Sequence, residues 1–139
     1  MEFLKFEVEG KLAKPSGNVW VNLNDVKLVR DRKDLCSTEM SSTEITELIL
    51  DISGTKESIY VFAYREYLDE ILRKVKADFI CLTQGENPCT HIILRKEVIV
   101  EVQGKYSKNK PYAVVTTLIN GKSQDHYVNE SATEIMELL

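Results

Sequence analysis

Short runs of apolar residues, many of them alternating with polar ones, predict β-strands in both halves of the chain. In the first half the runs cover residues 3–8, 19–23, 26–29, 45–52 and 59–64. In the second half they cover residues 79–82, 91–94, 98–102, 112–119 and 126–128. The spacing at 45–52 also fits a short helix, and we predict a strand there. The pattern is therefore typical of a mostly β protein.

Two segments have the spacing of an amphipathic helix, one near the end of each half. Apolar residues three and four positions apart mark them: Leu68, Ile71, Leu72 and Val75, then Ala132, Ile135, Met136 and Leu139. Ser131 is followed three residues later by Glu134, a capping box that is typical of a helix start. Each half is therefore expected to end in a helix.

Turn-forming residues and polar segments separate the predicted strands. Asn120-Gly121 is the strongest hairpin signal, because both residues tolerate the positive φ angles that a two-residue turn requires. Polar interruptions at 24–25 and 95–97 divide longer apolar runs. The polar segment 31–44 and the segment 104–111 are predicted to be loops.

The same order of predicted elements occurs twice, which indicates a tandem duplication. Residues 3–6 correspond to 79–82, and residues 65–72 correspond to 129–136, with the identical pairs Glu66/Glu130, Glu70/Glu134 and Ile71/Ile135. We therefore predict an α+β, mostly β fold of two repeated antiparallel units, each with about four strands and a closing C-terminal helix. The units are expected to span 1–76 and 77–139 and to pack as one compact domain, because units this small are marginally stable alone.

Composition and charge narrow the classes of function. The 139 residues carry a net charge of −4, and such an acidic chain is a poor candidate for sequence-independent binding of nucleic acid. The first residues do not form a signal peptide, and no apolar run approaches the roughly 18 residues that span a bilayer. We expect a soluble cytoplasmic protein that does not bind membranes.

The sequence contains no motif for a catalytic, metal or cofactor site, and we predict none of the three. The odd number of cysteines, Cys36, Cys81 and Cys89, argues against a disulfide framework, although a bridge between Cys81 and Cys89 stays open. The two histidines, His91 and His126, lie in predicted strands without a partner at metal-binding spacing. We expect both to be ordinary strand residues.

One segment is locally basic, and it is the first candidate binding site. Three lysines alternate with two tyrosines and with no acid across residues 104–112; the candidate residues are Lys105, Tyr106, Lys108, Lys110 and Tyr112. Lysines can bind phosphate or an acidic protein surface, and Tyr106 could stack on a base. The alternative is a solvated hairpin tip without a ligand.

An aromatic strand is the second candidate site. Tyr60, Phe62 and Tyr64 share one face of the predicted strand, and the neighbouring Val61 and Ala63 take the other. Aromatic residues are enriched at protein interfaces, so this face is a candidate interface. Packing of a helix against the sheet explains the same pattern.

Two family resemblances add to this interpretation. The second half resembles small FlbD-like proteins in its strand 117–119, the Asn120-Gly121 hairpin and the Val128-Asn129-Glu130-Ser131 step into a helix, and residues 3–8 and 19–26 resemble their opening. This resemblance implies a small non-catalytic accessory or regulatory protein, present as two divergent copies. Residues 100–107 and 118–122 resemble the LytTR-type DNA-binding domain, an assignment that the acidic charge opposes.

From these features we predict a small non-enzymatic interaction or regulatory protein that binds a protein partner or self-associates. An accessory or inhibitor protein of a phage or mobile element would have this character. The alternative is a nucleic-acid or nucleotide-phosphate binding module that uses the basic segment 104–112.

Overall fold

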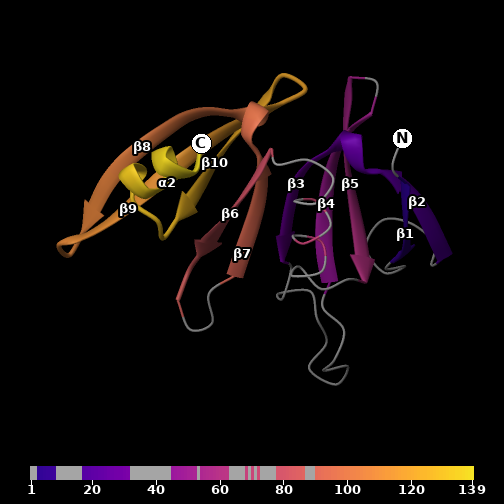
Figure 1. Cartoon of the computed structure of the whole chain (residues 1–139), viewed down its shortest axis with the longest axis horizontal. Coiled ribbons are helices and arrows are strands. Elements are labelled where there is room, and N and C mark those ends of the chain that lie inside the picture. Colours follow the sequence, from indigo (N-terminus) through magenta and orange to yellow (C-terminus); the bar gives the residue numbers. More distant parts are fainter. Residues whose placement is uncertain are drawn as a thin grey trace.

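The computed structural model describes residues 3–8, 17–31, 45–52, 54–62, 68, 70, 72, 78–86 and 90–139. Within these residues the strands form two antiparallel sheets (Figure 1). The seven-stranded sheet has the order β2-β1-β5-β4-β3-β7-β6 and contains β1 (Phe3–Val8), β2 (Gly17–Asn22), β3 (Val26–Asp31), β4 (Ile45–Ile52), β5 (Thr55–Phe62), β6 (Phe79–Gln84) and β7 (Thr90–Arg95). The three-stranded sheet has the order β10-β9-β8 and contains β8 (Ile99–Ser107), β9 (Lys110–Ile119) and β10 (Lys122–Val128). The predicted mostly β, antiparallel fold is confirmed.

The polar interruptions in the sequence are short 3₁₀ turns. The turn η1 (Leu23–Asp25) separates β2 from β3, and the turn η3 (Lys96–Val98) separates β7 from β8. In η1 the side chain of Asn22 accepts a hydrogen bond from the backbone N–H of Asn24 at 3.0 Å. Because each turn splits a long apolar run, the described residues of each half contribute five strands rather than the expected four or so.

Two-residue turns close both hairpins of the smaller sheet. Asn120 and Gly121 have φ angles of 50° and 74°, and Ile119 pairs with Lys122, so the predicted hairpin is confirmed. Lys108 and Asn109 also have positive φ, and Ser107 pairs with Lys110. The loop predicted at 104–111 is therefore wrong, because β8 and β9 continue to a tight turn in which asparagine tolerates the left-handed conformation.

One helix with defined bounds, α2 (Ala132–Leu138), lies in the part of the chain that the structure describes. The Ser131 hydroxyl oxygen accepts a hydrogen bond from the N–H of Glu134 at 3.2 Å, which confirms the predicted helix start. Of the helix predicted at 67–75, the structure describes only Leu68, Glu70 and Leu72. The prediction that each of two units is closed by a helix is therefore not supported.

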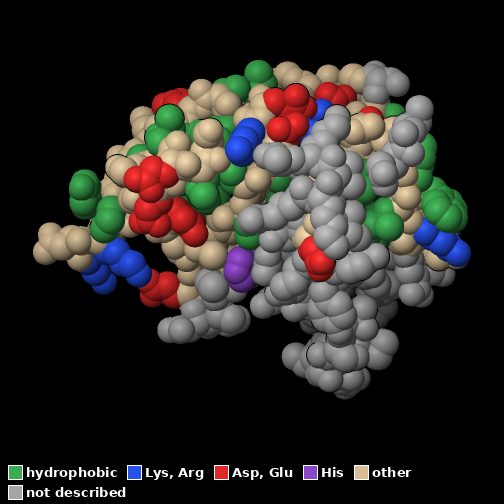
Figure 2. All heavy atoms as spheres, in the orientation of Figure 1, with side chains coloured by type: hydrophobic (Ala, Val, Ile, Leu, Met, Phe, Trp, Pro, Cys, Tyr) green, Lys and Arg blue, Asp and Glu red, His purple; other side chains and the backbone are tan. Residues whose placement is uncertain are grey.

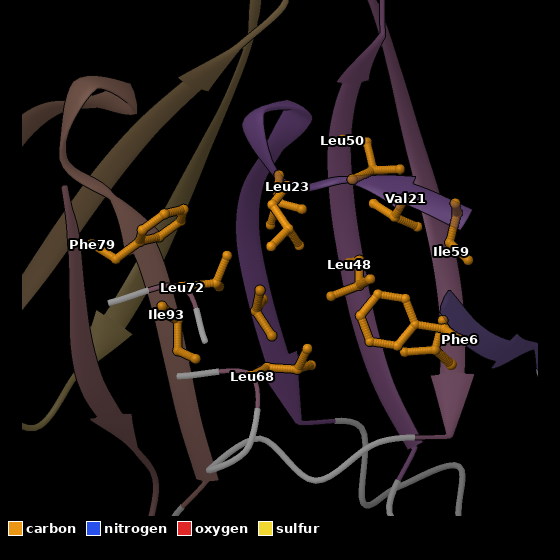
Figure 3. Close-up of a cluster of buried hydrophobic side chains, with 13 residues drawn as sticks. Phe6, Val21, Leu23, Leu48, Leu50, Ile59, Leu68, Leu72, Phe79 and Ile93 are labelled. Atoms are coloured by element: carbon orange, nitrogen blue, oxygen red, sulfur yellow. The ribbon is translucent and has the colours of Figure 1, made fainter. Parts of the chain in front are cut away.

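Strands β3, β4, β6 and β7 bury side chains on both faces of the larger sheet. One face contributes to a first cluster of buried residues, shown in Figure 3: Phe6, Val21, Leu23, Val26, Val29, Leu48, Leu50, Ile59, Val61, Leu68, Leu72, Phe79 and Ile93. The other face contributes to a second cluster, which the smaller sheet and α2 complete: Leu28, Ile49, Ile80, Leu82, Ile92, Leu94, Val98, Ala113, Val115, Ile119, Val128 and Ile135. Burial on both faces explains why these strands are continuously apolar.

The pairing of β3 with β7 joins the two halves of the chain. Its register is Leu28–Leu94, Val29–Ile93 and Arg30–Ile92. The buried Arg95 guanidinium donates to the carbonyl oxygens of Val26 at 2.9 Å and Leu23 at 3.2 Å. Its carbon Cζ also lies 4.5 Å from the ring centroid of Phe79. The larger sheet therefore continues across the boundary expected near residue 76.

The last strand of the second half is linked to β6 through Thr83. The backbone N–H of Asn129 donates to the carbonyl oxygen of Thr83 at 2.8 Å. The Glu130 carboxylate accepts hydrogen bonds from both the N–H and the hydroxyl of Thr83, each at 2.9 Å. These bonds hold the smaller sheet against the larger one.

Candidate functional site

The β8–β9 hairpin carries the residues of the predicted basic binding site. Its register puts Lys105 opposite Tyr112, next to the turn that contains Lys108. Side chains alternate between the two faces of a strand, so Lys105, Lys110 and Tyr112 share one face and Tyr106 lies on the other. The hairpin therefore brings lysines together with Tyr112 but separates them from Tyr106, which is 79% exposed.

A depression of about 420 Å³ lies beside the tip of this hairpin. It is lined by Glu86, Ser107, Lys108, Lys110, Pro111, Tyr112 and Asn129. The Nζ atom of Lys110 lies 3.4 Å from the Glu86 carboxylate, and both side chains are exposed. Since solvent screens such a pair, the ion pair is weak and leaves a modest excess of positive charge.

The predicted aromatic interface falls largely outside the described residues. Tyr60 is half-buried on β5, between the buried residues Ile59 and Val61 that face the first cluster. The side chain of Phe62 and the whole of Tyr64 are not among the described parts of the chain. The aromatic interface therefore stays a prediction.

A different aromatic surface, which the sequence pattern did not reveal, lies on the β1–β2 hairpin. A depression of about 320 Å³ is lined there by Phe3, Val19, Trp20, Val21, Asn22, Asp25, Leu50, Ile52, Glu57 and Ile59. Its floor consists of core residues of the first cluster, whereas Phe3 and Trp20, at its edge, share the opposite face of the hairpin and are 51% and 63% exposed. Figure 2 shows hydrophobic side chains gathered over this end of the molecule, at the right. We name the outer face of this hairpin, with Phe3, Lys5 and Trp20, the Trp20 surface.

Polar groups surround the Trp20 surface. The Nζ atom of Lys5, on the neighbouring strand, lies 5.8 Å from the centroid of the Trp20 ring, a cation–π contact. Asp25 and Glu57 lie on the rim of the depression. The exposed aromatic side chains of the hairpin's outer face therefore lie next to an apolar depression that two carboxylates border.

Alternation along β2 is the one signal that could have pointed to this surface. Val21 faces the first cluster, so the adjacent Trp20 must face the opposite way. Alternation alone does not tell which face of the strand is covered, because that depends on pairings with strands far away in the sequence. From the sequence alone, Trp20 is therefore predicted only as an ordinary strand residue, because its exposure depends on how the strands pair.

Comparisons with known proteins do not assign the chain to a family. No protein-family model, curated protein or solved structure matches it. The FlbD-like resemblance consequently stays a prediction, and the functional argument rests on the geometry of the chain itself.

His126 lies in the core of the second cluster rather than at a surface site. Its Nε2 atom and the hydroxyl of Thr117 share a hydrogen bond of 3.0 Å, and both side chains are buried. Burial, together with the positive charge of Arg30, lowers the pKa of His126 to about 4. The adjacent Asp125 instead accepts a hydrogen bond from the hydroxyl of Thr116 at 2.7 Å. His126 is therefore neutral near pH 7 and shielded from solvent.

The described residues contain neither a cluster of metal ligands nor a membrane-spanning helix. No group of three or more His, Cys, Asp and Glu side chains there could hold a metal ion. No helix among them is both long and apolar enough to cross a membrane. Cys81 is half-buried and packs against the first cluster. Cys36 and Cys89 lie outside the described residues, so a bridge between Cys81 and Cys89 stays open.

Proposed function

We propose that this chain is a small non-enzymatic interaction protein that binds a protein partner through the Trp20 surface. The observation that carries this proposal is the outer face of the β1–β2 hairpin, where the Phe3 and Trp20 side chains are exposed next to an apolar depression. Contact with a partner would remove this apolar surface from water, and tryptophan is the residue type most enriched at interaction hot spots. A regulatory or accessory protein, such as an inhibitor, would act in this way.

The charges at the rim suggest the chemistry of the partner. Asp25 and Glu57 border the depression. An incoming segment would therefore combine an apolar anchor residue with Lys or Arg beside it, since opposite charges at an interface rim steer association. Such a partner would also be favoured by the net charge of −4.

The surroundings of the titratable groups support a non-enzymatic role. Strongly shifted pKa values often mark catalytic sites. Here burial lowers the pKa of Arg95 and of His126. Arg95 holds backbone carbonyl groups, and His126 pairs with Thr117 inside the core. Both groups serve packing rather than a solvent-accessible reaction.

We also infer that the two halves are diverged copies of one unit, in which β1-β2-η1-β3-β4-β5 corresponds to β6-β7-η3-β8-β9-β10. Each series contains one hairpin, a 3₁₀ turn and three strands that pair in sequence order. The registers shift at matching places, between Val26 and Leu28 in β3 and between Ile99 and Glu101 in β8. Val26 and Ile99 each directly follow the 3₁₀ turn. Coinciding bulges support duplication, because a bulge is a specific feature rather than a common defect.

A capture experiment tests the proposed binding surface. We expect the wild-type chain to retain specific proteins from a cell lysate and the Trp20→Glu variant to lose them, because a charge replaces the aromatic anchor. Tyr127→Glu is the matched control, since Tyr127 is also 63% exposed but lies on β10. Identical sets of captured proteins for all three chains would contradict the proposal.

A second candidate function is the binding of phosphate groups at the basic hairpin. The depression beside Lys108 and Lys110 supports it, although the Glu86 carboxylate competes for Lys110. In gel-shift and calorimetric titrations, this alternative predicts binding of single-stranded nucleic acid that weakens with salt and with Lys108→Ala/Lys110→Ala. Absence of salt-dependent binding would exclude it.

A further inference from the structure

The second half of the chain contributes two side chains of its opening hairpin to the first cluster. Phe79 on β6 and Ile93 on β7 belong to the first cluster, although all other members of that cluster come from the first half. Figure 3 shows Leu72 between these two side chains. Phe79 and Ile93 are only 6% and 0% exposed. Together with the pairing of β7 along β3, they form an internal interface between the halves.

The Trp20 surface contains the corresponding residues of the first half. Asn22 and Arg95 are the residues that directly precede η1 and η3. Phe3 pairs with Asn22 as Phe79 pairs with Arg95. Trp20 precedes Asn22 by two positions, as Ile93 precedes Arg95. Phe3 and Trp20 thus repeat the docking pair Phe79 and Ile93, yet they are exposed to solvent.

The second half also repeats the surface that receives the docking pair, and no described strand covers it there. In the first half the outer edge of β3 is occupied by β7. The corresponding strand β8 pairs only with β9 among the described residues, so no described strand occupies its other edge. Val102 on β8 takes the position of Val29 on β3, and it is half-buried where Val29 is fully buried. The adjacent helix α2 exposes Met136 and Leu138.

The two open surfaces cannot meet within one chain, because β2 and β8 end the strand order on opposite sides of the molecule (Figure 1). We propose that they meet between chains: β2 of one copy pairs with the β8 edge of a second copy, and Trp20 lies beside Val102. This inference rests on the proposed binding role of the Trp20 surface and names a second copy of the chain as its partner. A head-to-tail contact of this kind produces rings or open filaments.

The contact between chains is weaker than the internal one, because two stabilising features of the β3–β7 junction are not repeated. Asn22 occupies the position that corresponds to Arg95, which donates hydrogen bonds to the carbonyl groups of Val26 and Leu23. Val100 on β8 occupies the position that corresponds to Lys27 on β3, and a valine cannot form the ion pair of 2.8 Å that Lys27 forms with Glu97. Association between chains should therefore be reversible and depend on concentration.

Sedimentation velocity over a wide range of protein concentration tests the proposal. We expect the mass of the wild-type chain to rise with concentration beyond a dimer. Trp20→Glu removes one surface, and Val100→Glu, at a 57% exposed position of β8, places a charge at the other, where Asn24 of the incoming copy corresponds to Glu97. Each variant should weaken association at least about tenfold, which corresponds to the loss of one interface anchor. Tyr127→Glu should leave it unchanged.

A mixture of the two variants tests the head-to-tail contact most directly. Each retains one intact surface, so an equimolar mixture of Trp20→Glu and Val100→Glu should form a dimer and nothing larger. A wild-type chain that stays monomeric at every concentration would overturn the proposal, and so would a dimer that is lost with Trp20→Glu but not with Val100→Glu. If the monomeric chain still captured a lysate protein through Trp20, the proposed function would stand and only the head-to-tail contact would fail.

Discussion

At the scale of single residues, His126 and Thr117 form a polar pair in a core position that is apolar in the first half. In the register of β9 and β10, His126 lies opposite Val115. In the register of β4 and β5, Ile59 lies opposite Leu48 at the corresponding place. Thr117 corresponds in the same way to Leu50. The first half therefore shows that an Ile and a Leu side chain can fill these positions.

This buried pair makes stability depend on pH. Because the pKa of His126 falls from 6.5 to about 4 on folding, the unfolded chain binds the proton first as the pH decreases. The stability that neutral His126 provides is complete above pH 6.5 and is lost as the pH falls toward 4, by up to about 3 kcal/mol. Urea denaturation at a series of pH values measures this loss.

The double variant Thr117→Leu/His126→Ile is the matched comparison for the pH series. It copies the packing of the first half and should abolish this part of the pH dependence while keeping the fold. The difference between the two chains isolates His126 from the carboxylates that titrate in the same range. Equal slopes for both chains between pH 6.5 and 4 would show that His126 is not buried as a neutral group.

The sequence predicts a strand at His126 but not its burial or its partner. Thr117 lies on the other strand of the hairpin, and its hydroxyl meets the imidazole only when the Asn120-Gly121 turn sets the register. The same limit applies to Trp20, whose strand position follows from alternation and whose exposure does not. Side-chain environment is therefore decided by pairings that a local pattern does not contain.

At the scale of elements, Arg95 is the side chain that connects β7 to the first half most firmly. It donates hydrogen bonds to the carbonyl groups of Val26 and Leu23 and stacks on Phe79. We expect Arg95→Met to destabilise the chain by about 3 kcal/mol, because buried carbonyl groups lose their donors. Thermal and chemical denaturation measure the change.

Lys27→Met is the control for that prediction. Lys27 pairs with Glu97 across the same junction, but the side chain of Glu97 is 63% exposed. Solvent screens such a pair, so its loss should cost less than about 1 kcal/mol. Comparable destabilisation by both substitutions would mean that the junction is held by net charge rather than by the hydrogen bonds of Arg95.

Local signals predicted some elements well and misjudged others for a physical reason. The Asn120-Gly121 hairpin and the Ser131 cap follow from residues that act on their immediate neighbours. The segment 104–111 was predicted as a loop, and its hairpin turn at Lys108-Asn109 lacks the Asn-Gly signal, since lysine is not typical of a left-handed turn position. Long strands on both sides hold that turn in place, and their pairing outweighs local preference.

At the scale of the whole molecule, long-range pairing decides what the sequence pattern leaves open. The mostly β character was predictable from apolar periodicity, but the pairing of β3 with β7 joins residues far apart in the chain. That pairing buries both faces of four strands, and β2 and β8 are each an end strand of one of the two described sheets. The candidate function of the Trp20 surface arises from this arrangement rather than from a motif.

Trp20 is the only tryptophan of the chain, so its fluorescence reports directly on the Trp20 surface. In dilute solution we expect emission typical of a solvent-exposed indole and efficient quenching by acrylamide. When a partner or a second copy binds, the emission should shift to shorter wavelength and quenching should fall. Unchanged emission and quenching under conditions where sedimentation shows a complex would contradict the account, because the bound protein would then contact another face.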